Sequence, residues 1–407
     1  MALTTIIALA LLFRRHDAGP VPSPNNNRPC VEFNLPVSAT AQNAAYDIIR
    51  VQNNIDATAF TVDLDTWSSP TPAQRLLRNI TVSDTFDINV QLCVPPNGTK
   101  SNHLQIASHG VAFDKRYWDA AVNPSEYSYV DATLAAGYSI LTYDRLGTGL
   151  SDKPDGDTIV QAPLELEILR GITQMARSGD LLKHAVGTEN GTVPETTSNH
   201  SIVAFDKIIH VGHSFGSFLT SALLTTYGNL SDAAIITGYV MNPHLADLRW
   251  TSFSLEFAPQ NNATLFGDRS AGYMVGGNRA AIQTGFFSTQ ANATTGIGGF
   301  EEEVLDYAFS IRQTVTGAET VSSSQLDLGA AESFEGPVQI VLGEFDYLAC
   351  RGNCNEAINL DSLKILYPKA KDIYPFIQPG TGHGLTMHRG ARLGYKASLD
   401  WLERQGL

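Results

Sequence analysis

The segment "HVGHSFGSFL" at residues 210–219 contains a G-x-S-x-G pattern centred on Ser214. A serine hydroxyl is a weak nucleophile unless a neighbouring base takes its proton, and that base needs an acid to orient it. Asp346 and His383 lie downstream in the order Ser, Asp, His. Because so short a pattern also arises by chance, its surroundings must decide whether Ser214 is a nucleophile or an ordinary loop serine.

The residues around Ser214 have the context that a nucleophile of this kind requires. The apolar run 206–214 predicts a buried strand, and 215–227 predicts an apolar helix. A sharp turn between them would expose the serine at the carboxyl edge of a sheet, where open α/β folds bind ligands. Gly212 and Gly216 would keep side chains out of the crowded turn. The pattern therefore predicts that Ser214 is a nucleophile.

The partner residues follow predicted strands in the same way. Asp346 ends the strand predicted over 336–346, and His383 lies in the glycine-bracketed loop "PGTGHGL" before a final helix over 388–404. Glu344 competes with Asp346 for the acid, but it falls within the strand run. His388 competes with His383 for the base, but at the helix start we expect it to be a surface or capping residue.

A substrate oxygen that becomes negative during attack needs hydrogen-bond donors already in place. The backbone N–H of Phe215 at the helix start is one candidate. The strand end "HGVAF" at 109–113 offers the other, the amide of Val111. These two amides are the predicted oxyanion hole.

The elements that must position these residues alternate along the chain. Near-continuous apolar runs predict buried strands, and amphipathic or apolar stretches between them predict helices, which is typical of a mostly parallel sheet covered on both faces. In the final helix, Leu393, Ala397 and Trp401 are predicted to face inward. The predicted strands are 103–110, 138–144, 206–214, 234–243 and 336–346, and the predicted helices are 128–137, 162–185, 215–227 and 388–404.

Two regions depart from this alternation. Residues 30–41 and 78–96 alternate apolar and polar side chains, which predicts half-buried antiparallel strands. Residues 245–330 interrupt the sheet pattern and are predicted to be an inserted, mainly helical cap over the core.

Five motifs in this order resemble the α/β-hydrolase fold superfamily: His109-Gly110, "YDRLGTGLSDKP" (143–154), "GHSFG" (212–216), "LGEFD" (342–346) and "GTGHG" (380–384). The chain looks most like the branch with a cap between core strands, and its first hundred residues resemble secreted fungal members. The resemblance implies that Ser214 is the nucleophile, Asp346 the acid and His383 the general base, with no cofactor or metal. Members that share the "DRLGxGxSDKP" segment use an aspartate nucleophile, so Ser214 favours acyl transfer.

We therefore expect a secreted serine hydrolase, similar to esterases and lipases, that cleaves a carboxylic ester through an acyl-enzyme. Its expected substrate is a small-molecule ester or amide. An aminopeptidase or a natural-product tailoring hydrolase or lactonase on the same triad is the alternative, and a peptidase would need an acidic group such as Glu301–Glu303 to hold the substrate amine. A non-catalytic binding protein would lack a triad member, and none is missing.

Several further side chains are assigned from position alone. His109, His213, Trp118 and Trp250 are candidates for contact with substrate, as are Tyr117, Phe286 and Phe287, and the alternative for each is ordinary packing. His210 is expected to be a core histidine. Asp144, Arg145 and Asp152 are expected to hold the glycine-rich 143–154 loop by charge-assisted hydrogen bonds.

Composition limits the partners. The net charge of −14, with no basic run to offset it, argues against nucleic acid or an anionic membrane as a partner. The apolar run from Ala2 to Phe13 is too short to span a bilayer and suits a secretory signal, although Arg14 and Arg15 follow it and no basic residues precede it. The predicted parts are a signal peptide (1–18), a flexible leader (19–29), the first part of the core (30–244), the cap (245–330) and the rest of the core (331–407).

Cysteines and glycosylation sequons agree with a secretory route. Cys350 and Cys354 are close enough to pair locally, which leaves Cys30 and Cys93 for a second bridge. No C-x-x-C pair or histidine cluster accompanies them, so a metal site is not expected. The sequon asparagines are Asn79, Asn97, Asn190, Asn199, Asn229, Asn262 and Asn292.

Overall fold

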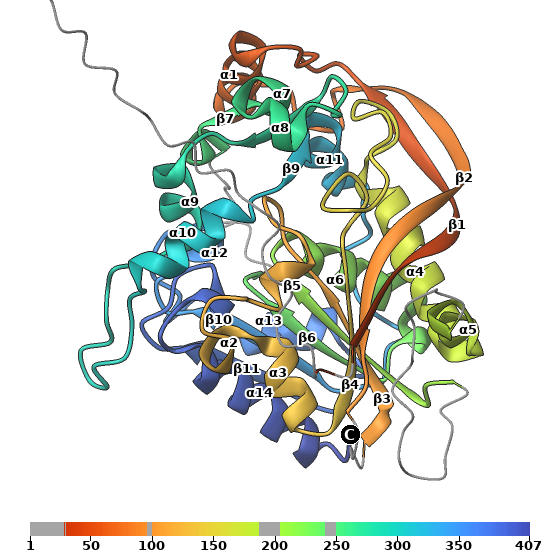
Figure 1. Ribbon diagram of the computed structural model, residues 1–407, viewed down its shortest axis with the longest axis vertical. Helices are drawn as coiled ribbons and strands as arrows, with labels where there is room; N and C mark the ends of the chain where they lie inside the picture. Colours follow the sequence, from red (N-terminus) through yellow and green to blue (C-terminus); the bar gives the residue numbers. More distant parts are fainter. Residues whose placement is uncertain (1–27, 29, 96–99, 187–203, 241–249) are drawn as a thin grey trace, which may run out of the picture.

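A computed structural model describes residues 28, 30–95, 100–186, 204–240 and 250–407 (Figure 1). The predicted signal peptide and nearly all of the predicted leader lie outside these ranges. Arg28 is described and forms ion pairs with Asp119 (2.6 Å) and Asp131 (2.5 Å). The end of the predicted leader is therefore fixed against the core.

An eight-stranded sheet forms the centre of the molecule, with strand order β1-β2-β4-β3-β5-β6-β10-β11. The six strands β4, β3, β5, β6, β10 and β11 run parallel to one another. At the other edge, β2 pairs antiparallel with β4, and β1 pairs antiparallel with β2. The predicted mostly parallel sheet is confirmed. Its strands are β1 (Cys30–Tyr46), β2 (Leu76–Cys93), β3 (Lys100–Ser108), β4 (Tyr138–Tyr143), β5 (Lys207–His213), β6 (Ala233–Thr237), β10 (Val338–Gly343) and β11 (Ile373–Gln378).

Helices cover both faces of this sheet (Figure 1). Helices α4 and α6 pack together on one face, and α3 and α14 pack together on the other. The helices of the core are α2 (Pro124–Tyr127), α3 (Tyr129–Ala135), α4 (Ala162–Ser178), α5 (Asp180–Val186), α6 (Phe215–Tyr227), α12 (Tyr347–Cys350), α13 (Leu360–Leu366) and α14 (Ala391–Arg404).

Two helix predictions need correction. The single helix predicted over 162–185 is divided into α4 and α5 at Gly179, whose φ of 85° suits a glycine that ends a helix. In α14, Leu393 is 40% exposed rather than inward. Trp401 is buried as predicted, on a face that also carries Ala391, Gly394 and Ser398. A Cβ at Gly394 would lie 2.0 Å from Gln378 Oε1 on β11, so a glycine is needed for this close approach.

The antiparallel pair β1–β2 confirms the alternating pattern seen in the sequence. Inward and outward side chains alternate along most of β1, and Cys30 stands directly opposite Cys93 in the register. The structure contains both expected disulfides, Cys30–Cys93 and Cys350–Cys354.

The insertion between β6 and β10 is mainly helical, but it also contains a small antiparallel sheet, β7-β8-β9, that the sequence did not predict. Its strands are β7 (Leu255–Phe257), β8 (Tyr273–Gly276) and β9 (Thr314–Thr316), and its helices are α7 (Ala258–Asn261), α8 (Ala263–Phe266), α9 (Arg279–Phe286), α10 (Glu302–Ser310) and α11 (Gly317–Ser322).

A helix that lies between β1 and β2, α1 (Asn54–Asp65), also packs on the insertion, beside β7 (Figure 1). The Asn54 side chain accepts a hydrogen bond from the Phe257 amide (2.9 Å), and the Asn54 amide donates to Gln260 Oε1 (2.8 Å). The α1 helix therefore contacts the insertion through both packing and hydrogen bonds. Within the described ranges, no helix is long and apolar enough to cross a membrane.

Candidate active site

Ser214 lies at the turn between β5 and α6, with φ 51° and ψ −116°. A positive φ is costly for a residue with a side chain and persists only where the surroundings enforce it. The surroundings here are very close: a Cβ at Gly216 would lie 2.1 Å from the Ser108 carbonyl oxygen, and one at Gly212 would lie 2.6 Å from the Gly216 carbonyl oxygen. The two flanking glycines are therefore required, as predicted, and the turn is strained around the serine.

His383 and Asp346 form a buried pair at the carboxyl ends of β11 and β10. Nδ1 of His383 lies 2.8 Å from Oδ2 of Asp346, and both side chains are almost fully buried. A carboxylate can only accept here, so Nδ1 carries the proton and Nε2 is left with its lone pair. Nε2 of His383 is buried and has no hydrogen-bond partner among the described residues.

The competing carboxylate, Glu344, is engaged elsewhere. Both of its side-chain oxygens accept from Nδ2 of Asn292 (3.0 and 2.9 Å), and Oε2 also accepts from the Gly380 amide (2.8 Å). Asp346, not Glu344, is the carboxylate that contacts His383.

The two predicted oxyanion donors lie beside Ser214. Phe215 is the next residue in the chain, and Val111 follows Gly110, where an added Cβ would lie 2.9 Å from Ser214 Cβ. Both residues are buried. Neither backbone N–H donates to any other described residue, so both are free to bind an oxygen at the serine.

His213 occupies the space beside the pair. Its ring stacks on Tyr117 with centroids 4.4 Å apart and lies 4.8 Å from the His383 ring. Thr237 Oγ1 donates its hydrogen to the Gly212 carbonyl (2.8 Å), so it accepts from Nδ1 of His213 (3.1 Å). Burial, reinforced by nearby His383, holds the pKa of His213 well below its usual value. The imidazole of His213 is therefore neutral and packs beside His383.

The other residues predicted to contact substrate, His109, Trp118 and Trp250, differ in how they lie relative to the His383–Asp346 pair. Both ring nitrogens of His109 are engaged: one faces the Gly110 carbonyl (2.8 Å), and the other accepts from the Arg145 amide (3.0 Å), which argues against contact with substrate. Trp118 packs edge-on against Tyr117 and lies near His213. Trp250 lies instead beside α1, where its amide donates to Asp65.

Aromatic packing around the insertion accounts for the remaining candidates. Phe286 lies 5.6 Å from the His383 ring and packs edge-on against Phe113 at 4.7 Å. Phe287 stacks on His388 with centroids 5.4 Å apart. Phe286 is thus the aromatic residue of the insertion that reaches the predicted base.

The expectation for His388 is wrong. The side chain is fully buried, not exposed. Its Nδ1 donates to the Gly384 carbonyl (2.8 Å), and its Nε2 accepts from two backbone amides, those of Ser288 (3.0 Å) and Gly382 (3.1 Å). Burial lowers its pKa to about 4. Its predicted position at the start of the final helix gave no sign that it accepts these hydrogen bonds, because Ser288 lies a hundred residues away in the chain.

The 143–154 loop is held largely as expected. Asp144 accepts from Nζ of Lys115 (2.9 Å) and from the Leu150 amide (2.8 Å), and Asp152 accepts from the Asp87 amide (2.8 Å).

Arg145 differs, because its Nη1 reaches out of the loop to Glu165 on α4 (2.6 Å) and to Glu319 on α11 (2.5 Å). Burial raises the pKa of Glu165 to about 8. His210 is a satisfied core histidine, as predicted, with Thr173 Oγ1 (3.0 Å) and Ser231 Oγ (2.9 Å) at its two nitrogens.

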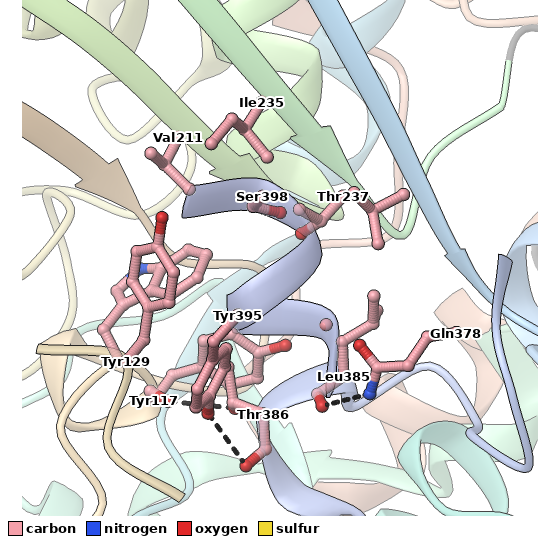
Figure 2. A pocket seen from close by; sticks show the side chains of 13 residues that line it. Tyr117, Tyr129, Val211, Ile235, Thr237, Gln378, Leu385, Thr386, Tyr395 and Ser398 are labelled. Carbon is pink, nitrogen blue, oxygen red and sulfur yellow. Dashed lines mark hydrogen bonds between the residues drawn. The ribbon is translucent and has the colours of Figure 1, made fainter. Parts of the chain in front are cut away.

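Two cavities lie near the site. Figure 2 shows a small internal cavity of about 30 Å³ between the sheet and α14, lined by residues that include Tyr117, Trp118, Thr237, Thr386 and Tyr395. Ser214 and His383 are not among the residues that line it. A larger surface hollow of about 460 Å³ lies between α9 and two residues, Phe345 and Tyr347, which flank Asp346 in the chain.

The predicted sequons differ in their surroundings. Asn97, Asn190 and Asn199 lie outside the described residues. Asn79 and Asn229 are exposed. Asn262 caps α8 through its side-chain oxygen. Nδ2 of Asn292, the atom that a glycan would occupy, donates to Glu344 instead.

A strained serine turn and a buried histidine–aspartate pair at the carboxyl edge of a mostly parallel sheet are features of the α/β-hydrolase class of enzymes. The model of the alpha/beta hydrolase family matches residues 106–393 of this chain. The chain belongs to that family and is a hydrolase.

Solved structures of similar fold include a thermophilic esterase from Thermogutta terrifontis, with 14% identity and a TM-score of 0.46 over 79% of this chain and 94% of that one. A putative aryl esterase from Burkholderia cenocepacia has 17% identity and a TM-score of 0.48 over 79% and 95%. The enol-lactonase from Burkholderia xenovorans LB400 has 14% identity and a TM-score of 0.45 over 78% and 97%. These proteins are similar to the chain in fold alone. Among curated proteins, none matches the chain in sequence.

Proposed function

We propose that the protein is a serine hydrolase that cleaves small carboxylic esters. The observation that carries the proposal is the buried His383–Asp346 pair, 2.8 Å apart, at the same sheet edge as the strained Ser214 turn. The free amides of Phe215 and Val111 support it, because a developing oxyanion needs donors that are not already engaged.

In this mechanism Ser214 Oγ attacks the ester carbonyl while Nε2 of His383 takes the hydroxyl proton. Asp346 keeps the other proton on Nδ1 and stabilises the imidazolium. The amides of Phe215 and Val111 bind the oxyanion. Collapse of the tetrahedral intermediate expels the alcohol, which receives the proton from His383 and leaves an acyl-enzyme. Water then attacks the acyl carbon with His383 as the base, and Ser214 is released with its proton restored.

The acidic run proposed for an aminopeptidase has other partners. Glu301 pairs with Arg389 (2.7 Å) and also accepts from the Tyr127 hydroxyl, and Glu302 pairs with Arg279 (2.9 Å). These contacts favour a structural role at the start of α10 over binding of a substrate amine. An ester or lactone substrate is therefore preferred to an aminoacyl amide.

We also propose that residues 245–330 act as a cap over a core made of residues 30–244 and 331–407, and that the protein is secreted after removal of residues 1–18. The two disulfides support an oxidising compartment.

The test compares the wild-type protein with Ser214→Ala on a short p-nitrophenyl ester. We expect the variant to fold normally and to lose hydrolysis by a factor of about 10⁶, in line with loss of a nucleophile. Undiminished turnover in the folded variant would refute the proposal. A panel of esters, lactones and aminoacyl amides on the wild-type protein then separates the ester hydrolase from the peptidase.

A further inference from the structure

One segment of the insertion lies directly on the loop that carries His383. This segment, residues 286–299, follows α9 and donates to or accepts from the backbone of 380–389 at several points. The Gly384 amide donates to the Phe286 carbonyl (2.7 Å), the Gly299 amide to the Gly380 carbonyl (3.1 Å), and the Arg389 amide to the Gly299 carbonyl (3.2 Å).

Glycines allow this close approach. A Cβ at Gly380 would lie 2.1 Å from the Ile297 carbonyl oxygen, and one at Gly382 would lie 2.9 Å from the Ser288 amide nitrogen. The position of residues 286–299 and the position of His383 are therefore not independent, because the two backbones touch.

His388 joins these two backbones through a single atom. Its Nε2 accepts from the Ser288 amide of the insertion and from the Gly382 amide that immediately precedes His383. Its Nδ1 must carry a proton, since it faces the Gly384 carbonyl. The neutral ring with hydrogen on Nδ1 satisfies all three backbone groups. Protonation of Nε2 would place a third N–H against two N–H donors and break both hydrogen bonds at once.

We propose that His388 is a positioning residue that fixes segment 286–299 and His383 relative to one another. In acid, protonation of His388 would release segment 286–299 and the His383 loop together. The catalytic consequence rests on the proposed function, in which His383 is the base. The structural consequence, a joint release of the Ser288 and Gly382 amides, does not.

The surroundings of His388 set the pH at which this release occurs. Rings of Phe287 and Phe300 pack against the imidazole. The charges of Asp346 and Glu301 also act on it, and Glu301 is paired with Arg389. The two carboxylates favour the protonated ring, but burial outweighs them and holds the pKa at about 4. The coupling is therefore intact at neutral pH and is lost as the pH falls through about 4.

The test uses His388→Gln, whose amide oxygen can accept at the position of Nε2, and His388→Leu, which has similar bulk and no acceptor. Hydrogen exchange measures protection of the Ser288 and Gly382 amides, and ester hydrolysis gives kcat and KM. His210→Leu is the matched control, because His210 is equally buried but bonds only Thr173 and Ser231.

We expect His388→Leu to reduce protection of both amides and kcat by about tenfold or more, since two buried donors lose their acceptor, with a smaller change in KM. His388→Gln should restore most of both. In the wild-type protein the two amides should lose protection together below pH 4, whereas in the Gln variant, which cannot titrate, they should stay protected. His210→Leu should lower stability without selective exposure of these amides.

Equal losses in the Gln and Leu variants, or separate loss of the two amides in acid, would overturn the proposal. If the Leu variant does not fold, the pH comparison between wild type and the Gln variant still decides. If the exchange results are as expected but no ester is hydrolysed, the proposed function fails and the coupling stands.

Discussion

Replacement of Asp346 by asparagine is the sharpest perturbation of the predicted triad, because the contacts of its side chain predict a changed proton position on His383 and little other change. Among the described residues, the Asp346 side chain has two hydrogen-bond partners: Oδ1 accepts from the Ala349 amide at the start of α12 (2.8 Å), and Oδ2 accepts from Nδ1 of His383. In Asp346→Asn, Oδ1 can keep the helix cap, while the amide nitrogen takes the place of Oδ2. The amide would then donate to Nδ1, and the His383 proton would move to Nε2.

A histidine with its proton on Nε2 cannot accept the proton of Ser214. We expect kcat to fall about 10⁴-fold, as for loss of the correct tautomer in a serine–histidine–aspartate triad. This corresponds to about 5.5 kcal/mol of transition-state stabilisation. The melting temperature should change little, because the cap remains and the variant buries a neutral group of the same shape.

The assay is steady-state hydrolysis of a p-nitrophenyl ester at neutral pH, together with thermal unfolding. Glu344→Gln is the matched control, since it alters the neighbouring carboxylate, which contacts Asn292 and Gly380 rather than His383. A loss of less than about tenfold in Asp346→Asn, or an equal loss in Glu344→Gln, would refute the assignment of Asp346 as the acid.

Further predictions concern the turn, a buried acid and a sequon. Gly216→Ala should prevent normal folding or abolish activity, because its Cβ would lie 2.1 Å from the Ser108 carbonyl oxygen; a soluble, active variant would contradict this. Burial raises the pKa of Glu165 from 4.5 to about 8, so the folded protein should lose stability as the pH rises from about 4.5 to 8 and Glu165 loses its proton. Glu165→Gln cannot titrate, so its melting temperature should fall less over this pH range. Peptide mass mapping of the secreted protein should find Asn292 without a glycan, since Glu344 binds its Nδ2.

The parts that sequence reasoning predicted best are those determined by local pattern. The strand, serine turn and helix at 207–227 were predicted almost to the residue, because the apolar runs are long and the glycines are required by local crowding. The β1–β2 pair was predicted from alternation, although β1 continues past residue 41 to Tyr46, and β2 begins earlier and ends earlier than the predicted 78–96, at Leu76 and Cys93.

The parts that it missed depend on distant segments. His388 looks like a surface residue from its neighbours in the chain, and only residues 286–299 folding over it make it buried. Leu393 was predicted to face inward by its spacing with Trp401. Trp401 is buried, but α14 approaches β11 through Gly394, and Leu393 is left 40% exposed. The sheet β7-β8-β9 has strands of three or four residues, too short for a period to be visible.

Stoichiometric labelling with a fluorophosphonate probe tests most directly whether Ser214 is an activated nucleophile. We expect one label per chain, mapped by peptide mass to Ser214, with labelling slowed strongly in His383→Ala. A folded wild-type protein that takes no label, or takes it at another residue, would show that Ser214 is not the nucleophile.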